Sequence, residues 1–271
     1  MDERQILQEQ LSAQEQGKSY VLVTILEAEG SSPRSSGKML VYEDGSIRGT
    51  VGGGSVERMA VADALLCLKK GENLVRTYDM DSPASETGMV CGGRVTLWLE
   101  AHQAKPLLVV CGAGHVGGAV LPLARNLGFD TLLLDERAPE LIQDKILLAD
   151  RFEPVQDYEK DLEQMELPPG AYYVVVTFGH RGDAEALKAV LRKQGAYVGM
   201  IGSRKKVQAV YRRLREEGIS EEELQAVYSP IGLDLGGETP EEIAVSVLSE
   251  ILTVKYGRTG KHMRDLGTEN P

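Results

Sequence analysis

The chain has 271 residues, of which 42% are hydrophobic, so it can form one large domain or two ordinary domains, each with its own core. The formal net charge of −11 argues against nucleic acid and anionic membranes as partners. The N-terminus lacks the pattern of a secretion signal, no apolar run is long enough to span a bilayer, and the three cysteines are widely spaced. We therefore expect a soluble, cytoplasmic protein with reduced thiols.

The first hundred residues predict a small α+β domain. Residues 3–16 have the spacing of an amphipathic helix, with Ile6, Leu7 and Leu11 facing inward. A turn at 43–45 joins two strands into a hairpin. Strands are expected at five places: 20–26, 38–42, 47–51, 73–79 and 94–100.

Loops rich in glycine and serine separate these elements. One spans residues 29–37 and another spans residues 80–91, while Gly52, Gly53 and Gly54 interrupt the chain before a helix. We expect Ser55 to cap that helix, which runs to about residue 68. The polar residues 101–106 suit a linker, so the first domain is assigned to 1–103 and a second domain to 104–257, with a polar tail at 258–271.

The second domain opens with the pattern of a dinucleotide-binding unit. An apolar run at 107–110 predicts a buried strand, and Gly112, Gly114 and Gly117 follow in G-x-G-x-x-G spacing. A helical pattern and a second apolar run come next, and the run ends at Asp135. This order of strand, glycine turn, helix, strand and acid predicts a Rossmann-type fold.

Each residue of this pattern has a physical reason. Gly112 allows a tight turn, Gly114 lets backbone amides approach a pyrophosphate, and Gly117 allows close packing of helix and strand. The helix N-terminus attracts an anion. Asp135 could accept hydrogen bonds from a ribose hydroxyl, which favours NAD(H), although the neighbouring Arg137 leaves a 2′-phosphate open.

Strands and helices alternate through the rest of the chain. Further strands are expected near 146–149, at 172–177 and at 196–201, and Thr239 is expected to cap a last helix, with Pro240 at its first position, that runs to about residue 254. The alternation predicts a parallel sheet covered on both faces. Because parallel strands end at one edge, the loops at Gly112, Asp135, His180 and Gly202 are expected to meet there.

Taken together, the loops resemble those of the XdhC/CoxI family. The matching segments occur in family order: GSSPR at 30–34, GKMLV at 37–41, GTVGGGSVE at 49–57, CGG at 91–93, the glycine turn at Gly112, TFGHRGD at 177–183, GMIGSRK at 199–205, and GLD at 232–234 followed by Thr239 and Pro240. The resemblance implies an accessory protein that binds the molybdenum cofactor, assists its sulfuration, and inserts it into a xanthine dehydrogenase-type hydroxylase. One departure is Phe178, where the family often has a second histidine.

A carrier of this cofactor needs donors for a phosphate, and a thiolate would suit its metal. Ser32 and Arg34 could hold a phosphate, although a solvated turn is the alternative. The amides of Gly52, Gly53 and Gly54 could form an anion nest or only a sharp turn. Cys91 could contact molybdenum or accept sulfur, because the thiolate is the reactive form.

The second domain offers further candidates at the edge where its parallel strands are expected to end, which we call the rim. His180 could act in acid–base chemistry, so it is grouped with Cys91 as a candidate catalytic residue. Ser203 and Arg204 could bind an anion, and Asp234 could orient a ligand, although solvated or turn-closing roles are the alternatives. No His or Cys pair has the spacing of a structural zinc site.

Three functions follow from these motifs. The first is the cofactor chaperone, with an apo molybdenum hydroxylase as its partner, a sulfur-donating cysteine desulfurase as a further partner, and a homodimer as the expected assembly. The second is an NAD(H)-dependent oxidoreductase, for which the sequence offers no clear base beside His180. The third is an interaction protein that senses nucleotides.

Overall fold

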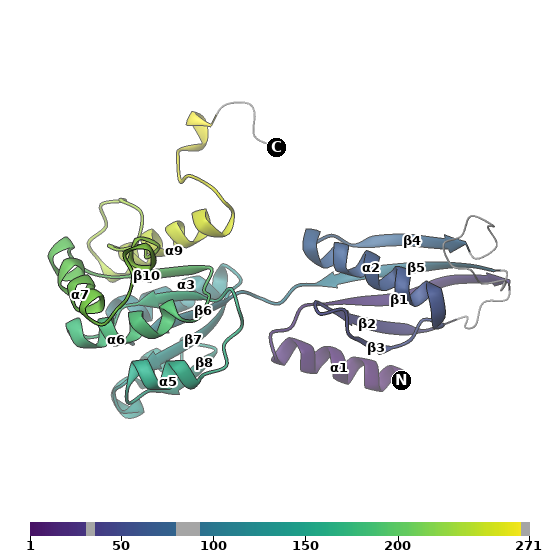
Figure 1. Ribbon diagram of the computed structural model, residues 1–271, viewed down its shortest axis with the longest axis horizontal. Coiled ribbons are helices and arrows are strands. Elements are labelled where there is room, and N and C mark those ends of the chain that lie inside the picture. The colour runs from purple at the N-terminus through teal and green to yellow at the C-terminus, as the bar shows by residue number, and fades with distance from the viewer. Residues whose placement is uncertain (31–35, 80–92, 267–271) are drawn as a thin grey trace. The chain divides into compact units, whose positions relative to one another are not determined.

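The computed structural model describes residues 1–30, 36–79 and 93–266, and for Gly179 and His180 it describes the backbone alone. The chain divides into two units, Met1–Ala104 and Lys105–Pro271. Unit 1 contains an antiparallel sheet with helices, and unit 2 contains a parallel sheet with helices (Figure 1). The predicted fold class, a Rossmann-type parallel sheet preceded by a smaller α+β domain, is therefore confirmed.

Unit 1 is built on a five-stranded sheet in the order β3-β2-β1-β5-β4, in which every neighbouring pair is antiparallel. Side chains alternate between the two faces of its strands. Two helices complete the part of the unit that the structure describes. The elements are α1 Glu3–Glu15, β1 Tyr20–Gly30, β2 Lys38–Tyr42, β3 Ile47–Gly49, α2 Gly54–Lys70, β4 Leu74–Asp79 and β5 Gly93–His102.

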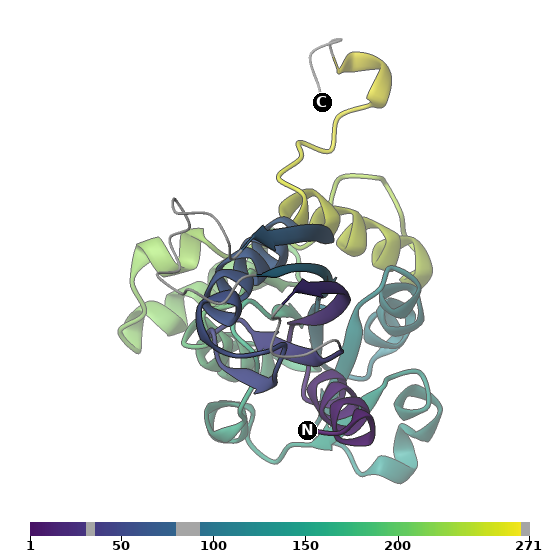
Figure 2. The same cartoon turned by 90° about the vertical axis from the view of Figure 1, so that its right-hand side faces the viewer.

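The two helices of unit 1 cover opposite faces of this sheet. Helix α2 shares a core with Val21 and Val23 of β1, whereas α1 packs through Ile6 against the face that carries Tyr20. Figure 2 shows the helices on either side of the sheet. The prediction that Leu7 and Leu11 face inward is wrong, because both are more than half exposed and α1 buries only Ile6 and Ala13. The narrow buried stripe reflects a helix that touches the sheet along one line.

Unit 2 is a five-stranded parallel sheet in the order β10-β9-β6-β7-β8. The order reverses between β6 and β9, which is the switch point where ligands bind in such sheets. Its strands are β6 Leu107–Cys111, β7 Asp130–Asp135, β8 Arg151–Pro154, β9 Tyr172–Val175 and β10 Tyr197–Met200. Its α-helices are α3 His115–Asn126, α4 Gln143–Ile146, α5 Tyr158–Gln164, α6 Gly179–Leu191, α7 Arg204–Glu216, α8 Glu221–Gln225 and α9 Pro240–Lys255.

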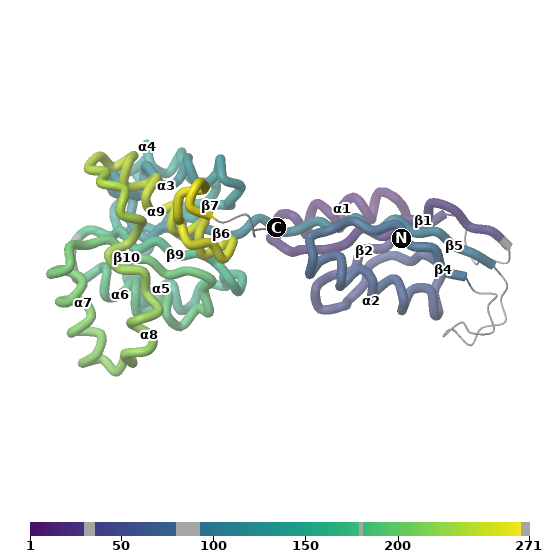
Figure 3. Tube along the Cα trace, turned by 90° about the horizontal axis from the view of Figure 1, so that it is seen from above, coloured from purple at the N-terminus to yellow at the C-terminus, as the bar shows by residue number. Residues whose placement is uncertain are grey.

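Helices cover both faces of the parallel sheet. Figure 3 shows α3, α4 and α9 on one side and α5, α6, α7 and α8 on the other. Each face has its own core: Val110 and Leu133 point toward α3 and α9, and Val109 and Leu134 point toward α5, α6 and α7. All five residues of β6 are buried, which confirms the buried strand predicted at 107–110 and extends it by Cys111.

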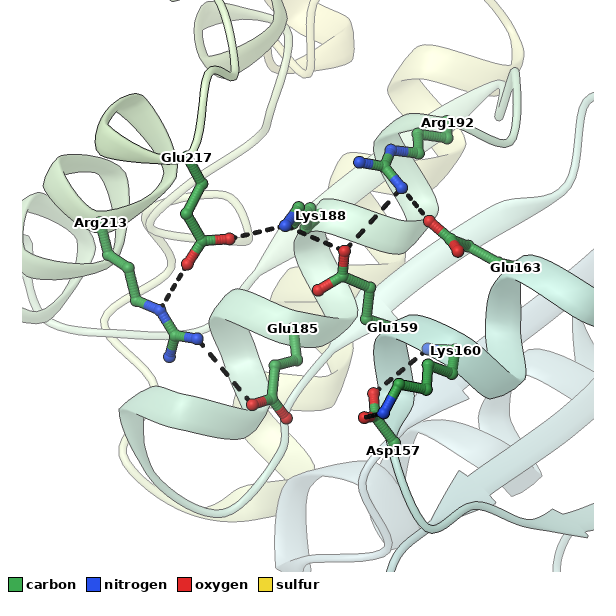
Figure 4. A network of polar contacts seen from close by, with 9 residues as sticks. All are labelled: Asp157, Glu159, Lys160, Glu163, Glu185, Lys188, Arg192, Arg213 and Glu217. Atoms are coloured by element: carbon green, nitrogen blue, oxygen red, sulfur yellow. Dashed lines mark hydrogen bonds and ion pairs between the residues drawn. The ribbon is translucent and has the colours of Figure 1, made fainter.

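Ion pairs join the outer surfaces of three of these helices (Figure 4). The ammonium of Lys188 on α6 lies 2.9 Å from a carboxylate oxygen of Glu159 on α5 and 2.7 Å from one of Glu217, which follows α7. Arg213 and Arg192 extend the network on either side. The network therefore fixes α6 between its two neighbours.

Several local predictions for unit 2 need correction. The strand expected at 146–149 is wrong, because α4 ends at Ile146 and the strand β8 begins only at Arg151. Residues 179–183 form the first turn of α6 and not a loop. The short helices α5 and α8 were not predicted. The last helix is confirmed: Thr239 caps α9 in a capping box with Glu242, and Pro240 occupies the first turn.

Within the described residues, no helix has both the length and the apolar character needed to cross a bilayer.

Candidate functional site

The candidate site of unit 2 lies where its parallel strands end. Strands β6, β7, β9 and β10 are adjacent and parallel, so their carboxyl ends share one edge of the sheet. The segments that carry Gly112, Asp135, His180 and Gly202 follow these four ends directly. The topology therefore brings together the four segments that the sequence assigned to one rim.

Two glycines of the G-x-G-x-x-G turn are required by packing. Gly112 has a φ of +118°, and a side chain there would overlap the backbone of Val176 at the end of β9. A side chain at Gly117 would overlap the carbonyl oxygen of Gly112. These two positions hold the turn tightly between β6, β9 and α3.

Gly114 differs from its two companions because it faces open space. It is the N-cap of α3, with a φ of −70°, and a Cβ there would meet no atom within 4 Å. The first helical hydrogen bond of α3 runs from the Gly118 amide to the Gly114 carbonyl over 2.9 Å. In the described part of the chain, no acceptor meets the amides of residues 114–117. Residues 114–116 are exposed or half-buried, so their amides can bind an anion at the positive end of the helix.

The Asp135 carboxylate at the end of β7 is bound within the chain itself. Its side chain is 4% exposed and accepts a hydrogen bond from the Ala113 amide over 2.6 Å. Arg137 donates three more, from its backbone amide (2.9 Å), its Nε (2.8 Å) and one terminal nitrogen (2.8 Å). Burial alone would raise the pKa of Asp135, yet these hydrogen bonds outweigh burial and lower the pKa below its ordinary value.

These contacts do not fit the role predicted for Asp135. A ribose diol needs a carboxylate that is open to the ligand, and both oxygens of Asp135 are engaged by Arg137 or Ala113. The acid stands where the sequence predicts, but its partner is an arginine of the same chain. The arrangement therefore fits NAD(H) poorly.

A second buried acid connects the ends of β9 and β10. The Asp183 side chain is fully buried, and one of its oxygens accepts a hydrogen bond from the Thr177 hydroxyl over 2.7 Å. The other oxygen forms an ion pair with the ammonium of Lys206 on α7. The pair joins the first turn of α6 to the first turn of α7. Sequence analysis did not single out Lys206, because nothing local links it to a residue 23 positions earlier.

Cys111 lies next to this acid at the end of β6. Burial, reinforced by the charge of Asp183, raises the pKa of its thiol to about 12. The thiol is therefore protonated at neutral pH and serves packing in the core.

Positive charge gathers at the N-terminus of α7. The Ser203 hydroxyl caps this helix by accepting a hydrogen bond from the Lys206 amide over 3.3 Å, and Arg204 and Lys205 are exposed in the first turn. Cations at the positive end of a helix dipole repel it, so this placement is unfavourable for the helix alone. A bound anion would offset that repulsion.

Two other candidates of unit 2 are placed in less detail. Asp234 is exposed on the segment between α8 and α9, which is tied to the sheet by a hydrogen bond of 3.1 Å from the Ile231 amide to the Met200 carbonyl. His180 belongs to the first turn of α6, and its side chain lies outside the described structure. Their predicted roles therefore remain predictions.

The glycine-rich turn of unit 1 is occupied by its own helix. The three glycines have positive φ values, and one oxygen of the Glu57 carboxylate accepts from the amides of Val51 (3.1 Å) and Gly53 (2.8 Å) and from the Thr50 hydroxyl. Gly53 is the N-cap of α2, so the prediction that Ser55 caps it is wrong: Ser55 is buried in the first turn. The Gly52 amide donates to the Thr50 hydroxyl over 3.2 Å.

Three candidate residues of unit 1 cannot be placed. Ser32, Arg34 and Cys91 lie outside the described residues, so the phosphate and thiolate roles predicted for them stay predictions. In the described ranges, no group of three His, Cys, Asp or Glu side chains could hold a metal ion.

Both halves of the chain match models of known protein families. The XdhC Rossmann domain profile matches residues 108–251, and the XdhC and CoxI family profile matches residues 13–79. Among curated proteins, the uncharacterized protein YqeB of Escherichia coli K12 is 35% identical over 94% of this chain and 47% of its own length.

Two further relatives carry functional names. The molybdenum cofactor insertion chaperone PaoD of E. coli K12 is 27% identical over 94% of this chain and 89% of its own length. A probable xanthine dehydrogenase subunit of Bacillus subtilis 168 is 26% identical over 59% of this chain and 46% of its own. The chain thus spans about half the length of YqeB and of the B. subtilis protein.

Proposed function

This chain belongs to the XdhC/CoxI family, and from that premise we propose that it binds the molybdenum cofactor as cargo and assists its insertion into a xanthine dehydrogenase-type molybdenum hydroxylase. The apo hydroxylase is then its partner. Assistance of cofactor sulfuration, with a cysteine desulfurase as sulfur donor, belongs to the same proposal, as do a homodimer and a cytoplasmic location.

The observation that carries this proposal is the match to a named insertion chaperone along nearly all of both chains. PaoD is matched over 94% of this chain and 89% of its own length, so the likeness includes both units and not the Rossmann unit alone. A shared Rossmann fold by itself would not indicate function, because many unrelated proteins use it.

The rim of unit 2 supports an anionic cargo. The molybdenum cofactor carries a phosphate, and the open amides that follow Gly114 can donate hydrogen bonds to one. Arg204 and Lys205 add exposed positive charge after β10, which β9 separates from β6 in the sheet. In a chain of net charge −11, such local positive charge favours binding of an anion at this rim.

The remaining candidates are assigned roles that follow from their chemistry. We assign Ser32 and Arg34 to a second anion contact, Cys91 to the metal or to sulfur, and His180 to proton transfer beside the cargo. Asp234 and Ser203 would orient the ligand. We assign the amides of Gly52 and Gly54 a lesser part, since Glu57 already holds the turn between them.

Anaerobic equilibrium binding of isolated molybdenum cofactor to the full-length protein, in competition with NADH, tests the proposal. We expect tight cofactor binding that NADH does not displace. Arg204→Ala should weaken it at least tenfold, whereas Arg212→Ala, an exposed arginine farther along the same helix, should change it less than twofold. Cys91→Ala should lower cofactor retention more than Asp135→Ala.

The rival function is an NAD(H)-dependent oxidoreductase. It predicts tight NADH binding that the cofactor does not affect and that Asp135→Ala abolishes. Such a result, with no cofactor bound, would refute the chaperone proposal. The engaged state of Asp135 favours the chaperone.

A further inference from the structure

The position where a Rossmann fold binds a ribose holds an ion pair in this protein. In this fold, an acid at the end of the second strand binds the ribose hydroxyls of an adenine dinucleotide. Here that acid, Asp135, stands at the correct place, at the end of β7 and beside the glycine turn. What differs is the group that it binds.

Arg137 contacts Asp135 across a tight turn, because the two residues are only two positions apart. Its backbone amide donates to Asp135 Oδ1 over 2.9 Å, which turns the chain back at the end of β7. Its side chain then lies along the carboxylate, with Nε on Oδ1 and a terminal nitrogen on Oδ2, both at 2.8 Å. This is a bidentate pair, the strongest geometry for an arginine and a carboxylate.

The pair blocks the carboxylate from a ligand. The Asp135 side chain is 4% exposed, while that of Arg137 is 41% exposed, so the guanidinium and not the carboxylate faces solvent at this point of the rim. The Ala113 amide uses what remains of Oδ2 on the inner side. A ribose diol that arrives at Asp135 meets the donors of Arg137 and finds both carboxylate oxygens already engaged.

We propose that Arg137 is a specificity-determining residue that excludes NAD(H) from the Rossmann unit by taking the place of its ribose diol on Asp135. The glycine turn then accepts ligands that present a phosphate without a ribose diol beyond it. Asp135 acts as a positioning residue, because it connects the turn at Ala113 to Arg137. This goes beyond the proposed function, and it holds for the Rossmann unit whatever the cargo is.

Titration of NADH into the full-length protein, followed by calorimetry and nucleotide fluorescence, tests the inference. Wild type should bind NADH no tighter than millimolar. Arg137→Ala removes the bidentate pair and leaves Asp135 with an open face, so NADH affinity should rise at least tenfold. Asp135→Asn added to Arg137→Ala should reverse that gain, because an amide is a weaker acceptor from ribose.

Matched controls make the result specific to this pair. Arg151→Ala removes an exposed arginine at the opposite end of the strands and should leave NADH binding unchanged. Arg137→Lys keeps the charge but cannot form the bidentate pair, so it should show part of the gain. NADH with a 2′-deoxyadenosine should gain little from Arg137→Ala, because it lacks a hydroxyl that Asp135 would bind.

Two outcomes would overturn the inference. One is wild-type binding of NADH at micromolar concentration that Asp135→Asn weakens. The other is an Arg137→Ala variant that melts at the wild-type temperature and yet gains no affinity. Neither measurement involves the molybdenum cofactor, so failure here is distinct from failure of the proposed function.

Discussion

The two glycine turns of this protein look alike in sequence and differ in what binds their amides. Each turn precedes a helix, and in each a carboxylate of the same chain accepts from a turn amide. In unit 1 the acid is Glu57, four residues after Gly53, and it binds two turn amides at once. In unit 2 the acid is Asp135, 22 residues after Ala113, and among the described amides of the turn it binds that of Ala113 alone.

The difference shows when a glycine-rich turn is available to a ligand. The Glu57 carboxylate satisfies the turn from within, as a capping side chain does, so the turn needs no external anion. Asp135 reaches the turn from the next strand and leaves the amides beyond Gly114 open. Glycine content alone therefore does not indicate whether a turn can bind a ligand. What matters is whether a carboxylate of the chain already accepts from the amides of the turn.

The largest expected effect is a loss of stability at Gly117, which we compare with a change at Gly114 in the same turn. Gly117→Ala puts a Cβ onto the carbonyl of Gly112, and we expect it to destabilise unit 2 by about 3 kcal/mol or more. Gly114→Ala meets no atom within 4 Å and should cost about 0.5 kcal/mol or less, yet weaken cofactor binding. Urea unfolding and cofactor titration of both variants measure this; equal stability losses would contradict it.

A substitution at Glu57 tests whether its carboxylate stabilises the glycine-rich turn of unit 1. Glu57→Ala removes the acceptor of two amides and a hydroxyl, so we expect a loss of about 2 kcal/mol. Glu57→Gln keeps an oxygen in place and should lose about half as much, which separates charge from geometry. Glu43→Gln, an exposed acid in the hairpin turn, is the control. No loss for Glu57→Ala would show that the turn is held by other contacts.

The Asp135 carboxylate should make the stability of unit 2 depend on pH. Its pKa is lowered in the folded protein, so its contribution is full above the ordinary carboxyl pKa of about 4 and is lost as pH falls below that value. Asp135→Asn should cost about 1–2 kcal/mol at pH 7, and the cost should shrink toward pH 3. Unfolding curves at several pH values check this; a cost independent of pH would contradict it.

The smallest expected effect concerns the helices that begin at the rim. Lys188→Met removes the ion pairs that join α6 to Glu159 and Glu217 (Figure 4), and we expect a loss of about 0.5–1 kcal/mol that falls at high salt. Cofactor affinity should stay within twofold of wild type, because Lys188 lies near the C-terminal end of α6, away from the rim where that helix begins. A large loss of affinity would mean that the network also positions the glycine turn.

Much of the fold could be predicted because its signals are local. The run before Gly112 is a buried strand, and Thr239 with Pro240 begins the last helix, because strand burial and helix capping depend on neighbouring residues. The prediction failed where two local signals compete. Ser55 has the chemistry of a cap, but Gly53 takes that position because its φ of +81° is open to glycine.

The sequence predicted where the candidate site lies in the sheet, but it did not predict which side chains contact one another there. The order of strands puts Gly112, Asp135 and Gly202 at one edge, and the alternation of strands and helices in the sequence predicts that edge. Whether a polar side chain there is open or engaged depends on which distant residue reaches it. Asp183 and Lys206 are 23 positions apart and meet only because α6 and α7 follow adjacent strands.

The sequence by itself therefore determined the family, the two-part fold class and the rim on which the candidate residues of unit 2 lie. Periodicity, glycine spacing and caps are properties of short segments, so they can be read without coordinates. The tertiary structure decided which amides stay open at Gly114, that Glu57 fills the turn of unit 1, and that Arg137 covers Asp135. These are choices among hydrogen-bond partners, and a partner is fixed only by the folded backbone that brings two groups within about 3 Å.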